Sequence, residues 1–133
     1  LENAHGSMRV PEGARAEMSA SAPPLVPVYL DAPARFRDSV RAVERGALAE
    51  AAPGLADARP RDVVTLLALA SRRAGNDRAT IVGLAARLWP PPAGVDPAAV
   101  AAGDQAALWR WHDALPLPPP KQWWRNWRDA FPE

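Results

Sequence analysis

Hydrophobic residues recur with a helical period along one long stretch of the chain, residues 59–89. Gly75 and Asn76 interrupt it with residues that tolerate a left-handed conformation, and Asp77 is a good N-cap for a second helix. Pro90 ends the pattern, because proline cannot continue a helix. We therefore expect two amphipathic helices joined by a tight turn. The apolar positions of the second helix repeat at i, i+3, i+4 and i+7: Ile81, Leu84, Ala85 and Leu88.

A further helix is predicted before this stretch. Asp31 is an N-cap residue, and Pro33 two positions later suits the first turn of a helix. Pro53 and Gly54 are expected to end the helix. Its apolar stripe consists of Phe36, Val40, Val43, Ala47 and Leu48.

Another helix is predicted after the stretch, over residues 97–115. Asp96 followed by Pro97 again combines an N-cap with a first-turn proline, and Gly103 with Asp104 is expected to break or bend the helix. Its apolar stripe consists of Val100, Ala107, Leu108, Trp111 and Leu115.

Tryptophan is concentrated near the C-terminal end, where a last helix is predicted over residues 121–131. Trp109 and Trp111 are two residues apart on one helix and point about 200° away from each other, so both cannot face one core. Trp123 and Trp124 diverge by about 100° for the same reason. We expect Trp109 and Trp123 to stay partly exposed. The rings expected in the core are Trp111, Trp124, Trp127 and Phe131.

The N-terminal part is predicted to be an arm outside the helical domain. Residues 1–7 read as the remnant of an expression tag before Met8. Residues 8–30 form a flexible or extended arm, since the first of them are rich in Ala, Pro, Ser and Gly and show no period. Residues 25–30 gather apolar side chains, and we expect them to lie along the surface or against a neighbouring molecule.

These patterns together predict an all-α protein without a sheet. The predicted domain spans residues 31–131 and is a small bundle of four or five short helices built around a central αα-hairpin. A flexible N-terminal arm precedes it, and the Trp-rich helix is its last element.

Composition narrows the class of protein. The chain has no cysteine, which excludes a disulfide framework and a thiolate site. No apolar run approaches the ~20 residues that a membrane span requires, so no membrane contact is expected. The strong Ala, Arg and Pro bias is typical of codon usage in some bacteria, and we expect a cytoplasmic bacterial protein.

Catalysis is not indicated. Without the tag, His112 is the remaining histidine, and its neighbours Trp111 and Asp113 do not complete a triad or a metal site. Serine and threonine do not occur in a glycine-rich elbow or phosphate loop. We therefore predict no catalytic residues, no metal and no cofactor.

One motif points to nucleic acid. Residues 59–89 carry six arginines and two aspartates, a net charge of +4. Residues 70–84 are similar to a DNA-reading helix-turn-helix in the spacing of Ser71, Gly75, Ile81 and Leu84. Asn76 departs from that pattern, because a buried aliphatic residue is usual there. The resemblance implies a DNA-binding segment over residues 70–89 that uses Arg72, Arg73, Arg78, Thr80 and Arg87.

The favoured hypothesis is a non-catalytic interaction module that binds another protein, or a second copy of the chain, as an adaptor or assembly subunit. Tryptophan and arginine are enriched at binding hot spots, and the Trp-rich segment carries both. DNA binding is the alternative. The predicted partner-binding residues are Trp109, Arg110, Trp123 and Arg125 in the C-terminal part, and Val28, Tyr29 and Leu30 in the arm.

Overall fold

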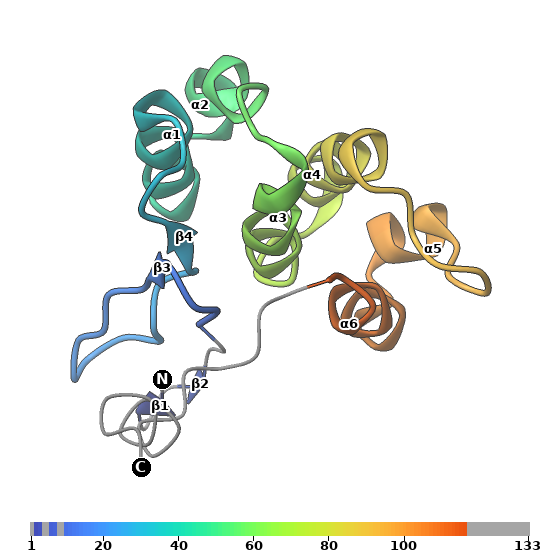
Figure 1. Ribbon diagram of the computed structural model, residues 1–133, viewed down its shortest axis with the longest axis horizontal. Coiled ribbons are helices and arrows are strands. Elements are labelled where there is room, and N and C mark those ends of the chain that lie inside the picture. Colours follow the sequence, from blue (N-terminus) through green and yellow to red (C-terminus); the bar gives the residue numbers. More distant parts are fainter. Residues whose placement is uncertain (1, 4–5, 8–9, 117–133) are drawn as a thin grey trace, which may run out of the picture.

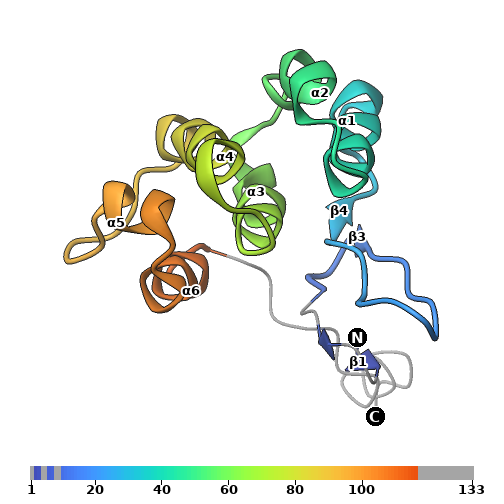
Figure 2. The same cartoon turned by 180° about the vertical axis from the view of Figure 1, so that it is seen from behind.

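The computed structural model describes residues 2–3, 6–7 and 10–116, and this part of the chain is mostly helical. The helical class predicted from the sequence is therefore confirmed. The helices are α1 (Ala34–Glu44), α2 (Leu48–Leu55), the 3-10 helix η1 (Pro60–Asp62), α3 (Val63–Ala70), α4 (Gly75–Leu88), α5 (Pro97–Ala102) and α6 (Gln105–Asp113). Figures 1 and 2 show α1 beside α2 at one side, α3 and α4 in the middle, and α5 and α6 at the other side.

The expectation of no sheet is wrong in detail, because two short strand pairs occur. Strand β1 (Glu2–Asn3) pairs antiparallel with β2 (Gly6–Ser7). Strand β3 (Ala14–Arg15) pairs antiparallel with β4 (Val28–Tyr29), so that Ala14 faces Tyr29 and Arg15 faces Val28. The second pair lies at the N-terminal side of α1 (Figure 1).

Helix α3 forms the centre of the core. All eight of its residues are buried, and Thr65 is the one residue among them with a polar side chain. A helix that is apolar around its whole circumference must be covered on all sides. Helix α4 packs against α3, and α6 also contacts it. The third cover is the segment around β4, as described below.

Two helices replace the single helix predicted over residues 31–54. Gly46 takes a left-handed φ of +90° and ends α1, with its N–H donating to the carbonyl of Val43 at 2.8 Å. The N–H of Ala47 donates to the carbonyl of Ala42 at 3.0 Å, which completes a glycine C-terminal cap. Pro53 and Gly54 lie inside α2 instead of ending it. A Cβ on Gly54 would overlap the hydroxyl of Ser39, so glycine is what lets α2 approach α1 closely.

The predicted end of α4 is confirmed, but its predicted N-cap is not. The helix ends at Leu88, before Pro90, as expected. It begins at Gly75 with Ala74 as N-cap, so Asp77 lies in the first turn and is not the cap. An acidic residue in this position still interacts favourably with the positive end of the helix dipole.

The helix predicted over residues 97–115 is divided at the expected place. Gly103, with φ of +117°, ends α5, and Asp104 caps α6 by accepting a hydrogen bond from the N–H of Ala107 at 3.0 Å. Asp96 caps α5 in the same way, through the N–H of Ala98 at 2.9 Å. These caps are local, which explains why sequence spacing identified them.

Candidate functional site

Helix α6 presents one tryptophan to the outside and one to the core. Trp111 is fully buried, whereas Trp109 is 37% exposed and Arg110 beside it is exposed. The Trp109 ring packs edge-on against the ring of His112, with centroids 5.2 Å apart and planes at 74°. His112 is itself buried, and its Nδ1 lies 3.3 Å from Oδ1 of Asp113. The exposures predicted for Trp109 and Trp111 are therefore confirmed.

The other C-terminal candidates lie outside the described residues. These are the predicted surface residues Trp123 and Arg125 and the predicted core rings Trp124, Trp127 and Phe131.

Two of the three predicted contact residues on the arm are not at the surface of the single chain. Val28 and Tyr29 are 4% and 1% exposed, so their side chains belong to the core. Only Leu30, at 60%, is exposed. These side chains belong to the same core cluster as α3, which has no polar face, and the carbonyl of Pro27 between them accepts a hydrogen bond from Thr65 of α3.

An ion pair on α1 holds the main chain of the arm. Arg41 and Glu44 are paired at 2.8 Å. Glu44 Oε1 accepts a hydrogen bond from the N–H of Val26 at 3.2 Å, and Arg41 donates to the carbonyl of Val26 at 3.1 Å. Burial raises the pKa of Glu44, against the opposing effect of Arg41 and the Val26 N–H. Arg72, beyond α3, also acts on this carboxylate through its charge.

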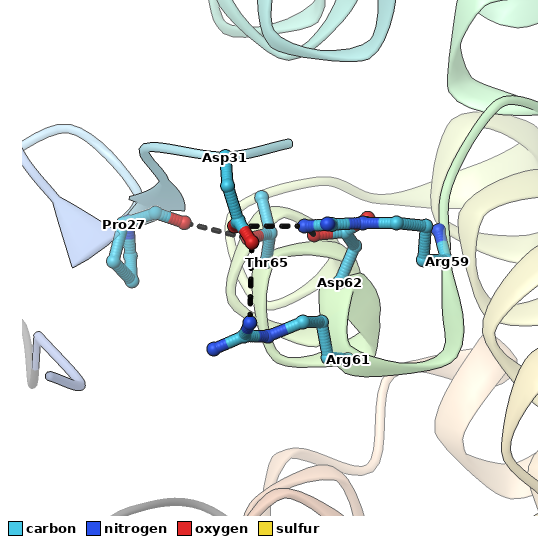
Figure 3. Close-up of polar contacts among 6 residues, drawn as sticks. All are labelled: Pro27, Asp31, Arg59, Arg61, Asp62 and Thr65. Carbon is cyan, nitrogen blue, oxygen red and sulfur yellow. Dashed lines mark hydrogen bonds and ion pairs between the residues drawn. The ribbon is translucent and has the colours of Figure 1, made fainter. Parts of the chain in front are cut away.

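A second polar network lies where the arm meets the start of α3 (Figure 3). Thr65 donates a hydrogen bond of 2.7 Å to the carbonyl of Pro27. Asp31 accepts hydrogen bonds from Arg59 at 3.2 Å and from Arg61 at 3.3 Å. The hydrogen bond from Arg59 is the main reason that the pKa of Asp31 is lowered. Asp31 is not the helix N-cap predicted from the sequence, because α1 begins at Ala34 with Pro33 as its N-cap. The carboxylate of Asp31 instead pairs with arginines far along the chain.

Asp62 completes this network from inside the core. It is fully buried and accepts hydrogen bonds from the main-chain N–H and the guanidinium of Arg59, at 2.8–3.1 Å. The guanidinium of Arg61 lies 4.1 Å from the centre of the Tyr29 ring, in the geometry of a cation–π contact. The arm is thus tied to the helices by main-chain hydrogen bonds, ion pairs and one ring contact.

The basic residues predicted for DNA binding divide into structural and exposed ones. Arg78 is 4% exposed and donates to the carbonyl of Val100 and to the side chain of Gln105, both at 2.6 Å, so it links α4 to α5 and α6. Arg78 is therefore not the exposed cation that the helix-turn-helix pattern predicts. Arg73 donates to the main-chain carbonyl of Glu44 at 2.9 Å. Arg72 is half-buried, whereas Thr80 and Arg87 are exposed on α4.

Sequence reasoning missed Arg41, Glu44 and Thr65 as the residues that hold the arm. A signal for one of them was present, because Glu44 follows Val40 by four residues and so falls within the apolar stripe of its helix. A charged residue in that position needs a partner inside the protein.

The described part of the chain lacks two features of other functional classes. Its acidic residues and histidines form no group of three or more that could hold a metal ion. None of its helices has the length and apolar character needed to cross a bilayer. Comparisons with protein-family models, with curated proteins and with solved structures found no match to this chain.

Proposed function

We propose that this chain is a non-catalytic helical interaction module, an adaptor or assembly subunit, which binds another protein through the exposed side of α6. The observation that carries the proposal is the division of α6 into a buried face with Trp111 and an outer face with Trp109 and Arg110. Tryptophan and arginine together are the residue types most enriched at the energetic centres of protein interfaces.

The proposal includes a finer view of the fold and of the cell compartment. Helices α3 and α4 form the central hairpin of a small bundle, and Trp123 and Arg125 of the Trp-rich segment are further partner-binding residues. We also propose that the protein works in the bacterial cytoplasm. These statements rest on the sequence patterns given above.

The experiment compares two exposed tryptophans. A photo-crosslinking amino acid is placed at Ala106, which is exposed three residues before Trp109 on α6. The protein captured there is then purified, and its affinity is measured for the native chain, for Trp109→Ala and for Trp89→Ala, where Trp89 is 41% exposed at the end of α4. We expect Trp109→Ala to weaken binding about 30-fold, as for a hot spot, and Trp89→Ala to change it less than about twofold. Equal effects of the two substitutions would contradict the proposal.

The alternative function, DNA binding through residues 70–89, is favoured by one observation. Thr80 and Arg87 are exposed on α4, the helix that would enter the major groove. Charge reversal at Arg87 tests it without touching the buried Arg78. A DNA-binding protein loses affinity steeply between low and high salt, and Arg87→Glu should remove most of the remaining affinity. An aromatic protein interface is expected to respond weakly to both changes.

A further inference from the structure

The N-terminal arm, residues 10–30, has hydrogen bonds of its own. Besides the pairing of β3 with β4, the N–H of Leu25 donates to the carbonyl of Glu17 at 2.8 Å. The N–H of Leu30 donates to the carbonyl of Gly13 at 2.9 Å. These bonds join arm residues to one another, so none of them is lost when the arm exchanges one set of helices for another.

The helices hold the arm as they would hold a bound peptide. The ion pair of Arg41 and Glu44 binds both the carbonyl and the N–H of Val26, and Thr65 binds the carbonyl of Pro27. All three bonds run from helix side chains to main-chain atoms, which is how extended peptides are commonly recognised. Such bonds do not require the arm and the helices to belong to the same chain.

The side chains of Arg41, Glu44 and Thr65 form what we call the arm site. Apolar contacts also stabilise the arm in this position. Val26, Val28 and Tyr29 are each less than 5% exposed and belong to the same core cluster as α3. Removal of the arm would expose α3 to water, so the arm site requires an occupant. A second copy of the chain carries the identical segment, and its fit to the site is therefore assured.

The covalent connection between the arm and α1 is short. It consists of residues 30–33, of which Leu30 and Asp31 are exposed. In this connection the N–H of Ala32 donates to the carbonyl of Tyr29 at 3.1 Å, and Asp31 is paired with Arg59 and Arg61. Straightening of the connection requires these surface ion pairs to open, and exposed pairs contribute little to stability. It also requires Ala32, which is 4% exposed, to leave the core, and an alanine side chain buries little apolar area.

We propose that two copies of this chain exchange their N-terminal arms, so that residues 24–29 of each copy occupy the arm site of the other. Exchange of identical elements is a low-cost route to a symmetric dimer, because it reuses contacts that the single chain already makes. The inference deepens the proposed function by naming a second copy as one partner, and it uses a surface other than the outer face of α6.

Cross-linking between distinguishable chains tests the exchange. The chain has no cysteine, so single cysteines can be placed cleanly. One isotope-labelled chain carries Leu25→Cys on the arm, and an unlabelled chain carries Arg45→Cys beside Glu44. The two are mixed in denaturant, refolded at high concentration and treated with a flexible bismaleimide. A matched control replaces Arg45→Cys by Arg87→Cys, at an equally exposed position on α4. A chain with both Leu25→Cys and Arg45→Cys serves to show that the reagent spans the pair.

We expect at least tenfold more linkage between positions 25 and 45 of different chains than between positions 25 and 87. Asp31→Asn, which weakens both ion pairs of the connection, should raise the interchain linkage further. Linkage within the doubly substituted chain, without an excess of interchain linkage at position 45 over position 87, would overturn the proposal. Failure of the proposed α6 interface is recognised separately, because it would leave this linkage unchanged while Trp109→Ala had no effect on binding.

Discussion

Helices α3 and α6 both contribute to one core, but they differ in how much of their surface is left for other roles. All eight residues of α3 are buried, so no side chain of α3 is available to a partner. Four of the nine residues of α6 are buried, and Trp109 and Arg110 lie on its outer side. The sequences explain this difference in burial. Helix α3 has an apolar residue at nearly every position, whereas the apolar residues of α6 lie along one face.

The difference shows that hydrophobic content alone does not locate an interaction surface. Among the helices that the structure describes, the most apolar one, α3, is also fully buried, and it shares its core cluster with the arm that the sequence suggested as a binding surface. A better indication of an interaction surface is a large aromatic ring that stays exposed on a helix whose apolar stripe is already buried. The packing of the core does not explain the exposure of such a ring.

The largest effect on stability is expected from a substitution on the buried face of α6, compared with one on its outer face. Trp111→Ala should reduce the free energy of unfolding by about 3–5 kcal/mol, because a fully buried ring leaves a cavity. Trp109→Ala, two residues away, should reduce it by only about 0.5–1.5 kcal/mol, the range expected for loss of its edge contact with the His112 ring. Denaturant unfolding of both variants gives the measurement. Similar losses for the two would mean that α6 has no outer face.

The next largest effect on stability is expected where the arm is bound to α3. Thr65→Val keeps the shape of the side chain but leaves the carbonyl of Pro27 without its donor, which should cost about 1–3 kcal/mol of unfolding free energy. Thr80→Val on the exposed side of α4 is the matched control and should change stability by less than about 0.5 kcal/mol. If the two substitutions had the same effect, the arm would not be held at α3 in solution.

Local features of this fold could be predicted from the sequence. Asp96 and Asp104 cap helices through N–H groups two and three residues away, and Gly103 ends α5 with a left-handed φ. The burial of Trp111 and the exposure of Trp109 follow from the angle between neighbouring side chains of a helix. In each case the cause lies within a few residues of the effect.

Features that depend on distant residues were missed. The pattern around Arg78 predicts a surface cation, yet Val100 and Gln105, more than twenty residues further on, provide its hydrogen-bond acceptors. The proline-limited segment around Val28 and Tyr29 predicts surface residues, because the core cluster that buries them is formed by residues distant in the sequence. The break at Gly46 was missed for a different reason, since a glycine in a helical pattern is compatible with both a continuous and an ended helix.

The two carboxylates that engage the arm segment and its connection should give stability profiles of opposite sign with pH. Burial raises the pKa of Glu44 above its ordinary value of 4.5. The folded protein then binds the proton of Glu44 more tightly than the unfolded chain does. The contribution of Glu44 to the free energy of unfolding is therefore fully present below pH 4.5, and it is lost as pH rises through the pKa of the folded state. Relative to Glu44→Gln, the native chain should become less stable as pH increases over that interval. Unfolding free energies measured from pH 4 to 7 would contradict this if the difference stayed constant or increased.

The smallest effect on stability is expected for Asp31, and its dependence on pH is opposite to that of Glu44. Its hydrogen bond to Arg59, first among the causes, lowers its pKa below the ordinary value of 3.8. The contribution of Asp31 is therefore present above pH 3.8 and is lost as pH falls through the folded pKa. Because the carboxylate is exposed, salt should reduce the effect, whereas the buried Glu44 should respond less to salt. The native chain and Asp31→Asn, unfolded between pH 2 and 5 at low and high salt, should converge in stability at the acid end. A difference that grew toward low pH would show that the ion pairs of Asp31 do not hold the connection between the arm and α1.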